Sequence, residues 1–171
     1  ETIQTEREIP TPVHPSASAI GIDMGVARFA TFSDGSSITP LHSFRKHEKK
    51  LAALQRKLAK RTKFSANWQK LKIRIQRLHR KIVNVRNDFL HKATTAISKN
   101  HAVVVMEDLK VRNMSRSASG TLEAPGKNVR AKAGLNKSIL DQGWFEFRRQ
   151  LACKSAWFGG NLLVVPAQYT S

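Results

Sequence analysis

A short apolar run, AIGIDMGV at residues 19–26, constrains this chain more than any other stretch, because it has the composition of a buried strand that ends on a carboxylate. A charge at the end of a buried strand is costly unless it meets a cation or hydrogen-bond donors. Asp23 is therefore a candidate metal ligand. The alternative is that Asp23 only caps a turn with Gly25, a role that aspartate often takes beside glycine.

A second run, HAVVVMEDL at residues 101–109, also ends in carboxylates. Continuous runs of β-branched residues are typical of strands buried on both faces of a parallel sheet. Alternation along a strand places Glu107 and Asp108 on opposite faces, so only one of them can point toward a shared site. We expect Asp23 and Glu107 to lie close enough to share a divalent ion, and hard oxygen ligands suit magnesium or manganese. Asp108 has a simpler role available, as the cap of the turn that follows.

Three short strands are expected early in the chain, over residues 19–23, 28–32 and 37–42. The dipeptide Asp34-Gly35 lies between the second and the third, where it is the expected turn of a β-hairpin. Gly25 permits the tight turn between the first and the second. The three strands are therefore predicted to form a meander.

Two helices are predicted next, over residues 44–61 and 67–99, and the break around residues 62–65 lets them fold back as an antiparallel hairpin. The longer helix has apolar residues that step alternately by three and four, which is the seam pattern of a coiled coil. These seam residues are Trp68, Leu71, Ile75, Leu78, Ile82, Val85 and Phe89.

The polar stretch over residues 110–135 is expected to form a mobile loop without a packed core. A single helix should follow over residues 135–158, and its tryptophans are expected in the core rather than as nucleotide platforms. Its apolar stripe consists of Ile139, Leu140, Trp144, Phe147, Leu151 and Trp157. Gly159-Gly160 should end this helix, and residues 162–165 should form a last buried strand stopped by Pro166.

The charge of the chain indicates its partner. Thirty Lys and Arg against twelve Asp and Glu leave a formal charge of +18, which repels itself in a compact fold unless a polyanion binds. Nucleic acid is the first candidate, and an anionic membrane surface is the second. No apolar run approaches the roughly 20 residues of a membrane span, and residues 1–4 do not resemble a signal peptide. The expected location is cytoplasmic and nucleoid-associated.

Basic residues concentrate on the predicted hairpin, where no acid occurs between Glu48 and Asp88. A run of charges is often only a solvated helix face, but such faces usually carry acids that pair with the bases. A hairpin that tracks phosphates is the better interpretation. The candidate nucleic-acid-binding residues are Lys49, Lys50, Arg56, Lys57, Lys60, Arg61, Arg74, Arg77, Arg80, Lys81, Lys110 and Arg112.

Two further features bound the organisation of the domain. Cys153 is the only cysteine, so these residues hold neither a disulfide framework nor a zinc cluster. Residues 2–9 have the pattern of an edge strand, and Pro10, Pro12 and Pro15 then interrupt regular structure. Residues 1–18 are therefore expected to be the tail of an upstream unit and its linker.

In their order along the chain, several motifs together resemble the TnpB (OrfB) proteins of bacterial insertion sequences. They are G-I-D-M-G, the basic hairpin, V-V-V-M-E-D-L-K-V, L-N-K-S-I-L-D-Q-G-W-F-E-F-R-R-Q-L and L-V-V-P-A-Q-Y-T-S. Each motif alone is weak, but the ordered set is specific. The resemblance covers residues 19–171.

The resemblance implies a RuvC-like nuclease domain over residues 19–171, an α/β domain with the mixed sheet of the ribonuclease H fold and an inserted helical hairpin over residues 44–99. It further implies an RNA-guided DNA endonuclease, related to type V CRISPR effectors, with DNA and a guide RNA as partners. Asp23 matches the family's first catalytic acid and Glu107 its second. The implied chemistry is phosphodiester hydrolysis assisted by two magnesium or manganese ions.

The resemblance also implies parts that these residues do not contain. Family members carry paired C-x-x-C zinc motifs and a third catalytic aspartate beyond the segment that matches Tyr169-Thr170-Ser171. Residues 1–9 match only the last strand of an N-terminal β-barrel. Zinc is therefore expected only in a C-terminal segment outside this sequence. With Asp23 and Glu107 alone, metal binding should be weak and cleavage by this chain should be slight or absent.

Two other classes of function remain open at this point. A non-catalytic nucleic-acid-binding protein would use the basic hairpin alone and would bind with a steep salt dependence unaffected by loss of Asp23. An actin-like ATPase or sugar kinase can also begin with G-I-D-x-G. That class usually follows the motif with Thr or Ser, whereas Val26-Ala27-Arg28 follow here.

Overall fold

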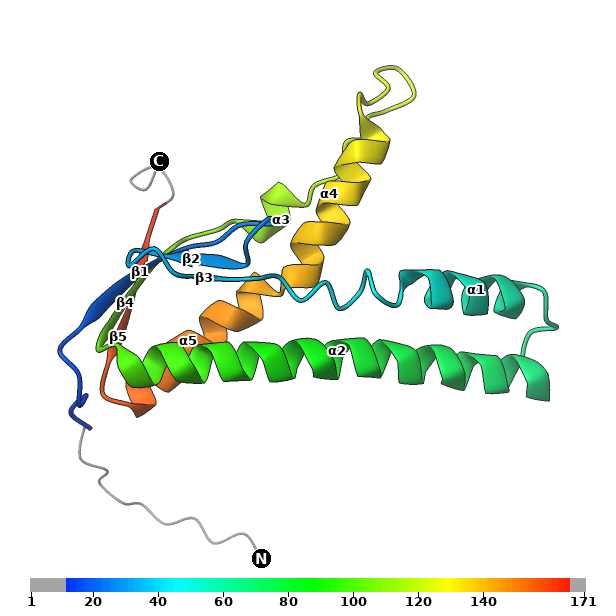
Figure 1. Cartoon of the computed structure of the whole chain (residues 1–171). Helices are drawn as coiled ribbons and strands as arrows, with labels where there is room; N and C mark the ends of the chain where they lie inside the picture. Colours follow the sequence, from blue (N-terminus) through cyan, green and yellow to red (C-terminus); the bar gives the residue numbers. More distant parts are fainter. Residues whose placement is uncertain (1–11, 167–171) are drawn as a thin grey trace, which may run out of the picture.

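The structure is a computed structural model that describes residues 12–166. The predicted edge strand over residues 2–9 and the final residues 167–171 lie outside the described residues. Five strands and five helices form the described part, which Figure 1 shows in chain order. They are β1 (Ala19–Asp23), β2 (Ala30–Phe32), β3 (Ser37–Ile38), α1 (Glu48–Ala59), α2 (Ala66–Asn100), β4 (Val103–Glu107), α3 (Val111–Met114), α4 (Val129–Gln142), α5 (Trp144–Trp157) and β5 (Asn161–Val165).

The five strands form one mixed sheet in the order β3-β2-β1-β4-β5. The β1, β2 and β3 strands pair antiparallel, whereas β4 runs parallel to both β1 and β5. The predicted turn is confirmed, because Gly35 has a φ of +86° and the Asp34 carboxylate accepts a hydrogen bond from the amide of Ser36 at 2.8 Å. The mixed α/β class is therefore confirmed, with β1 and β4 side by side at the centre of the sheet.

The predicted second and third strands are too long. The β2 strand begins at Ala30 rather than at residue 28, and β3 ends at Ile38 rather than at residue 42. Pro40 has no amide hydrogen to donate to a neighbouring strand, and His42 has a φ of +51°, which is incompatible with an extended chain. The chain therefore leaves the sheet after Ile38.

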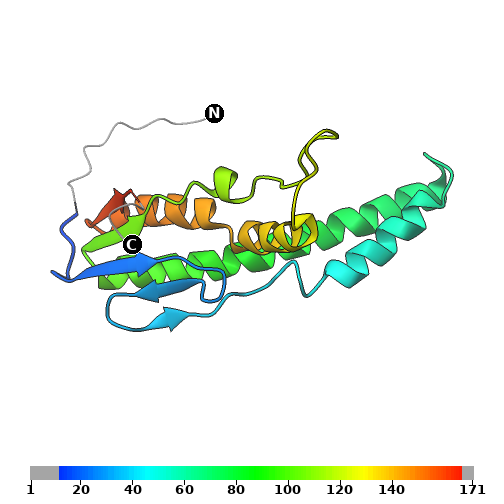
Figure 2. The same ribbon diagram turned by 90° about the horizontal axis from the view of Figure 1, so that it is seen from above.

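Helices cover only one face of the sheet among the described residues. Ile20 and Ile22 of β1 and Val104 and Met106 of β4 are buried and belong to the same core cluster as residues of α2 and α5. Alternate residues of the same strands are exposed or half-buried, and they include Gly21, Asp23, Val105 and Glu107. In Figures 1 and 2 the helices α2 and α5 lie side by side along the sheet. The burial pattern of β1 and β4 places Asp23 and Glu107 on the other, open face.

The long helix α2 packs against different elements along its two halves. Along its N-terminal half, Leu78 and Ile82 pack with Leu51 of α1 in a small core of their own. Along its C-terminal half, Leu90 and Ile97 join the main core with α5. The expected seam is wrong at Val85, which is 42% exposed, because the partner of α2 changes between Ile82 and Leu90 and the buried face changes with it.

The helix α1 is shorter than expected at both ends, whereas α2 differs little from its expected bounds. The first runs over Glu48–Ala59 rather than residues 44–61, and the second over Ala66–Asn100 rather than residues 67–99. They are joined by a short turn, and Figures 1 and 2 show them antiparallel, with α1 and the N-terminal half of α2 extending beyond the sheet. Ser65 begins α2 as its N-cap, because its hydroxyl accepts a hydrogen bond from the amide of Trp68.

The single helix expected over residues 135–158 is wrong, because Gly143 divides it into α4 and α5. Gly143 has a φ of +76°, a left-handed conformation that ends one helix and begins the next. A Cβ atom at this position would also lie 3.2 Å from Arg86 Cδ and 3.3 Å from Leu90 Cδ1. Gly143 therefore allows both the bend between α4 and α5 and the close approach of α5 to α2.

The expected loop over residues 110–135 is also wrong in part. It contains α3 and the first half of α4, and between them Gly120 and Pro125 form an isolated bridge. Lys132 donates to the carbonyl of Met114 at 2.6 Å, and Asn136 donates to that of Ser115 at 2.9 Å. These contacts fix α4 against the end of α3, so the segment is built by hydrogen bonds rather than by a large apolar core.

The expected burial of the tryptophans is confirmed for one of the two in this region. Trp144 is 3% exposed and belongs to the main core, together with Ile139, Phe147 and Leu151. Trp157 is 72% exposed and Leu140 is 57% exposed, so they do not belong to the buried stripe. The bend at Gly143 rotates α5 relative to α4, and one continuous helical stripe cannot describe both helices.

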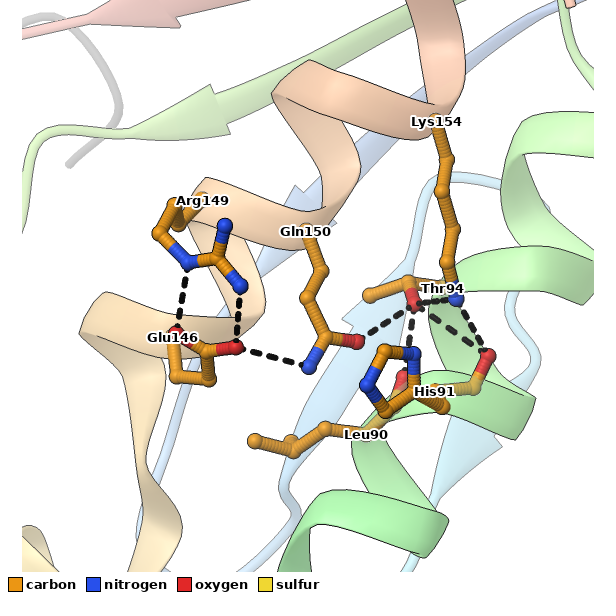
Figure 3. Close-up of polar contacts among 7 residues, drawn as sticks. All are labelled: Leu90, His91, Thr94, Glu146, Arg149, Gln150 and Lys154. Atoms are coloured by element: carbon orange, nitrogen blue, oxygen red, sulfur yellow. Dashed lines mark hydrogen bonds and ion pairs between the residues drawn. The ribbon is translucent and has the colours of Figure 1, made fainter. Parts of the chain in front are cut away.

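A polar network joins α5 to α2 at the edge of the core (Figure 3). Lys154 donates to the carbonyl of His91 at 2.7 Å and to the hydroxyls of Thr94 and Thr95 at 2.8 and 2.7 Å. All three hydrogens of the ammonium group are thus used, and burial lowers the pKa of Lys154.

The same network continues along α5 through Gln150. Its carbonyl oxygen lies 3.1 Å from the hydroxyl of buried Thr94, and its amide nitrogen donates to Glu146 at 2.9 Å. Arg149 binds the same carboxylate with two hydrogen bonds of 2.7 Å. The hydrogen bonds from Arg149 and then from Gln150 lower the pKa of Glu146 from its ordinary value of 4.5 to about 2.

We expect Glu146→Gln to lower the free energy of unfolding by about 1 kcal/mol at pH 7, a value reduced because Arg149 is largely exposed. A carboxylate whose pKa is lowered by folding stabilises the native state above pH 4.5, and this contribution is lost as the pH falls toward 2. Urea denaturation of both proteins between pH 2 and 7 measures the difference. A difference that is the same at every pH would contradict the role of the ionised carboxylate.

Candidate metal and nucleic-acid sites

The sheet register brings the two predicted acids together. Ile22 of β1 pairs with Met106 of the parallel strand β4, so the next residue of each strand is Asp23 and Glu107 respectively. Both residues line one depression of about 270 Å³ on the open face of the sheet. Its other lining residues include Gly21, Thr31, Ser33 and Val165. Neighbouring central strands therefore present two carboxylates at the same level, as their positions in the sequence predict.

The surroundings of Asp23 differ from those of a turn cap. Within residues 12–166 no hydrogen bond or ion pair holds the Asp23 side chain, and Gly25 has no left-handed φ. The hydroxyl of Ser33 instead binds the neighbouring amide of Gly21 at 3.0 Å. Asp23 is exposed and Glu107 is half-buried. Oxygen ligands on a concave surface that solvent reaches suit a hard divalent cation.

The described residues supply two carboxylates to this depression. Among residues 12–166 no group of three or more His, Cys, Asp or Glu side chains is placed to hold a metal ion. Two carboxylates fit one cation that keeps several of its water ligands, which is the usual binding mode of magnesium. A site for two ions needs further ligands.

Asp108 is not the cap that the sequence suggests. Its carboxylate forms an ion pair with Arg148 of α5, and its amide donates to the carbonyl of Val165 at 2.8 Å. The cap position of α3 is Lys110, and it makes no side-chain cap hydrogen bond. Asp108 therefore fixes the end of β4 to α5, while Glu107 faces the open side of the sheet.

A basic cleft adjoins the acidic depression. It measures about 370 Å³, and Glu107 lines both hollows. Lys110 and Arg112 line the cleft, together with Arg148 and the exposed ring of Phe145. A phosphate bound in this cleft would lie next to Glu107. Two of the predicted nucleic-acid-binding residues thus line the same cleft as one of the two predicted metal ligands.

A second basic surface lies on the α1–α2 pair. We call it the hairpin groove, and it is lined by Lys50, Leu54, Arg74, Arg77, Leu78 and Lys81 and measures about 400 Å³. Its four basic side chains are exposed, and its lining contains no acid. Cations on both walls of one groove can contact successive phosphates of a nucleic-acid strand.

The other basic residues predicted on the hairpin do not line this groove. Lys49, Arg56, Lys57, Lys60, Arg61 and Arg80 are exposed on α1, on α2 or on the turn between them. The basic composition of α1 and α2 is a property of the sequence, but the selection of the four groove residues depends on how α1 packs on α2. The two helices pack through the small core of Leu51, Leu78 and Ile82.

Sequence reasoning missed the aromatic and cationic residues that α5 contributes to the cleft. Arg148, Trp144 and Phe145 all line it. The motif W-F-E-F-R-R-Q contains them, but its helical periodicity alone predicts only core positions. Asp108 could have led to Arg148, because a second carboxylate next to Glu107 needs a cation of its own.

Within residues 12–166, none of the helices has both the length and the apolarity that crossing a bilayer requires. The longest of them, α2, carries many of the basic residues named above.

Comparisons with known proteins give a consistent result. The profile of the OrfB_IS605 family, described as "Probable transposase", matches residues 2–118. An Escherichia coli K12 protein named "Putative RNA-guided DNA endonuclease InsQ" is 64% identical over 170 residues, which cover 99% of this chain and 42% of the relative. A Streptomyces pristinaespiralis protein named "Putative RNA-guided DNA endonuclease" is 35% identical over 161 residues, which cover 94% of this chain and 36% of the relative.

The chain corresponds to only part of each relative. Nearly all of the chain is similar to both relatives, but the chain spans less than half of the length of either. The matched family profile includes Asp23 and Glu107 and ends before α4.

Proposed function

Because the chain belongs to the OrfB family of transposases, we propose that it forms the RuvC-like, ribonuclease H-like part of an RNA-guided DNA endonuclease. The observation that carries the proposal is the pairing of β1 with β4, which brings Asp23 and Glu107 to one level on the open face of the sheet. The names of both relatives support the same activity.

The architecture supports the proposed fold. A ribonuclease H-like domain needs a mixed sheet whose central strands present acids, and β1 and β4 are such strands. The antiparallel meander of β1 to β3 precedes the parallel strands, and α2 and α5 cover one face only. In this proposal, α1 and the N-terminal half of α2 form a basic hairpin inserted between β3 and β4.

The proposed roles follow from the chemistry of the residues. Asp23 and Glu107 would hold magnesium or manganese, which supplies an activated water and stabilises the leaving oxygen during phosphodiester hydrolysis. Lys110 and Arg112 would bind a phosphate of the strand beside the carboxylates. The hairpin groove would bind the backbone of DNA or of a guide RNA farther from the acids.

Manganese binding tests the paired carboxylates without requiring cleavage. Titrating the chain with Mn²⁺ and following the signal of the free ion by electron paramagnetic resonance should reveal weak binding. We expect Asp23→Asn and Glu107→Gln each to lower the affinity at least about tenfold, because each removes a charged ligand. Cleavage by the chain alone should be slight, because two carboxylates do not hold two ions.

Asp108→Asn is the matched control for this test. It removes an equal charge from the position next to Glu107, but this carboxylate is paired with Arg148. We expect its manganese affinity to equal that of the unmodified chain. If all three variants lose affinity equally, the binding is a general effect of negative charge. Strong magnesium-dependent cleavage by the chain alone, abolished by Asp23→Ala, would contradict the expected incompleteness of the site.

A further inference from the structure

Two aromatic rings lie at the outer end of the α1–α2 pair, far along the chain from the paired carboxylates. Phe64 belongs to the turn that joins the helices, and its side chain is 67% exposed. Trp68, in the first turn of α2, is half-buried. The two ring centroids are 5.5 Å apart and the ring planes are inclined at 58°. Neither residue belongs to the core clusters of the described chain.

The backbone holds Phe64 in an unusual conformation. Its φ is +67°, in the left-handed region that a bulky side chain rarely adopts. Gln69 donates from its side chain to the carbonyl of Phe64 at 3.1 Å, and Ser65 fixes the following residues as the N-cap of α2. Strain of this kind persists where surrounding contacts impose it, and it is often found at binding sites. Here it exposes a large apolar ring at the end of a hairpin.

The rings are surrounded by cations. The ammonium group of Lys63 lies 5.1 Å from the centroid of Phe64, and that of Lys72 lies 5.2 Å from the centroid of Trp68. Lys60, Arg61 and Lys70 are also exposed near the turn, and no acid occurs between Glu48 and Asp88. The tip thus presents aromatic faces within a positive field.

We infer that the hairpin tip, defined as Lys63, Phe64, Trp68 and Lys72, is a stacking platform for an unpaired nucleobase. Aromatic faces bind bases by stacking, whereas the adjacent cations bind the flanking phosphates, and together they favour a single-stranded segment over a closed duplex. An apolar protein partner would match the rings but not the surrounding positive charge. The inference rests on the proposed function, which supplies nucleic acid as the polyanion. It adds that the tip binds unpaired bases.

The test uses the full chain with Trp157→Phe, so that Trp68 becomes the only tryptophan that solvent reaches easily, because Trp144 is buried. The probes are oligothymidylate and oligouridylate of about 12 nucleotides, together with a DNA duplex of the same length. We expect both single strands to quench Trp68 fluorescence. Quenching by either oligonucleotide supports the platform. The oligonucleotide that binds with the higher affinity shows whether DNA or RNA is the preferred strand.

Two substitutions at one position separate stacking from apolar contact. Phe64→Tyr keeps an aromatic face and should bind the single strands as tightly as the parent. Phe64→Leu keeps the apolar bulk without the face, and it should bind them at least about fivefold more weakly while the affinity for the duplex stays within about twofold. Circular dichroism and thermal unfolding confirm that both variants fold. Lys63→Gln and Lys72→Gln should each weaken binding less than Phe64→Leu.

The outcomes distinguish this inference from the proposed nuclease site. Asp23→Asn should leave the quenching unchanged, because the tip does not contain the carboxylates. Equal affinity of the Phe64→Leu variant and the parent for single strands would overturn the inference. So would an equal loss for single strands and duplex, or the absence of quenching by both oligonucleotides.

Discussion

Replacing the four basic residues of the hairpin groove with glutamine should weaken binding of duplex DNA by roughly a thousandfold at about 0.1 M salt. Each cation that neutralises a phosphate releases counterions, and each contributes about 0.9 to the slope of log affinity against log salt. The slope should therefore decrease by up to about 3.6. Fluorescence anisotropy with a labelled duplex at several salt concentrations measures both quantities. The substitutions are Lys50→Gln, Arg74→Gln, Arg77→Gln and Lys81→Gln.

A second fourfold variant provides the control, because it changes the net charge by the same amount. Its substitutions are Lys99→Gln, Arg116→Gln, Lys127→Gln and Arg130→Gln, all at exposed positions outside the hairpin groove and the basic cleft. We expect the control to retain most of the slope of the unmodified chain. Equal slopes for the two variants would mean that binding depends on total charge, and the groove would then have no special role.

This pair of variants also separates two functions. A protein that binds nucleic acid without cutting it would depend on the groove and would be indifferent to Asp23. The proposed nuclease part needs both features, and they occupy different regions of the fold: the acids lie at the centre of the sheet, and the groove lies between α1 and α2. Loss of one should leave the other measurable.

The closeness of Asp23 and Glu107 could be predicted from local sequence patterns, because these patterns fix which face of each strand is buried and which strands are central. Alternation along a strand assigns Glu107 and Asp108 to opposite faces, and the apolar runs at β1 and β4 mark strands that belong at the centre of a sheet. The register then follows, because a shift of one residue would expose Ile22 and Met106. The function of Asp23 and Glu107 as metal ligands stays a prediction.

Features that depend on distant contacts could not be predicted in this way. The bend at Gly143 exists because α5 approaches Arg86 and Leu90 of α2, which are more than fifty residues away in the chain. The start of α4 depends on hydrogen bonds from Lys132 and Asn136 to the end of α3. Helical periodicity alone favours one continuous helix across Gly143, and polar composition alone favours a loop at the start of α4. The same limit applies to the hairpin groove, whose four cations are selected by helix packing.

The substitution with the largest expected effect on stability is Phe147→Ala. Phe147 of α5 is fully buried, and its ring lies edge-on against that of Phe29, with centroids 4.9 Å apart. Phe29 makes a second edge-on contact with Phe89 of α2 at 5.2 Å. The three rings therefore join α5, α2 and the segment that leads from Asp23 into β2. Removing the Phe147 ring takes away one of the two contacts of Phe29 and should loosen the support of the acidic depression.

We expect Phe147→Ala to lower the free energy of unfolding by about 3–5 kcal/mol, because it creates a cavity and removes an aromatic pair. Phe145→Ala is the matched control, since it makes the same chemical change two residues away on the same helix, where the ring is 76% exposed. Its effect should stay within about 0.5 kcal/mol. Urea denaturation followed by circular dichroism compares them. Similar losses for both variants would mean that α5 does not pack on the sheet through Phe147, and the support of Asp23 by the three rings would then have no basis.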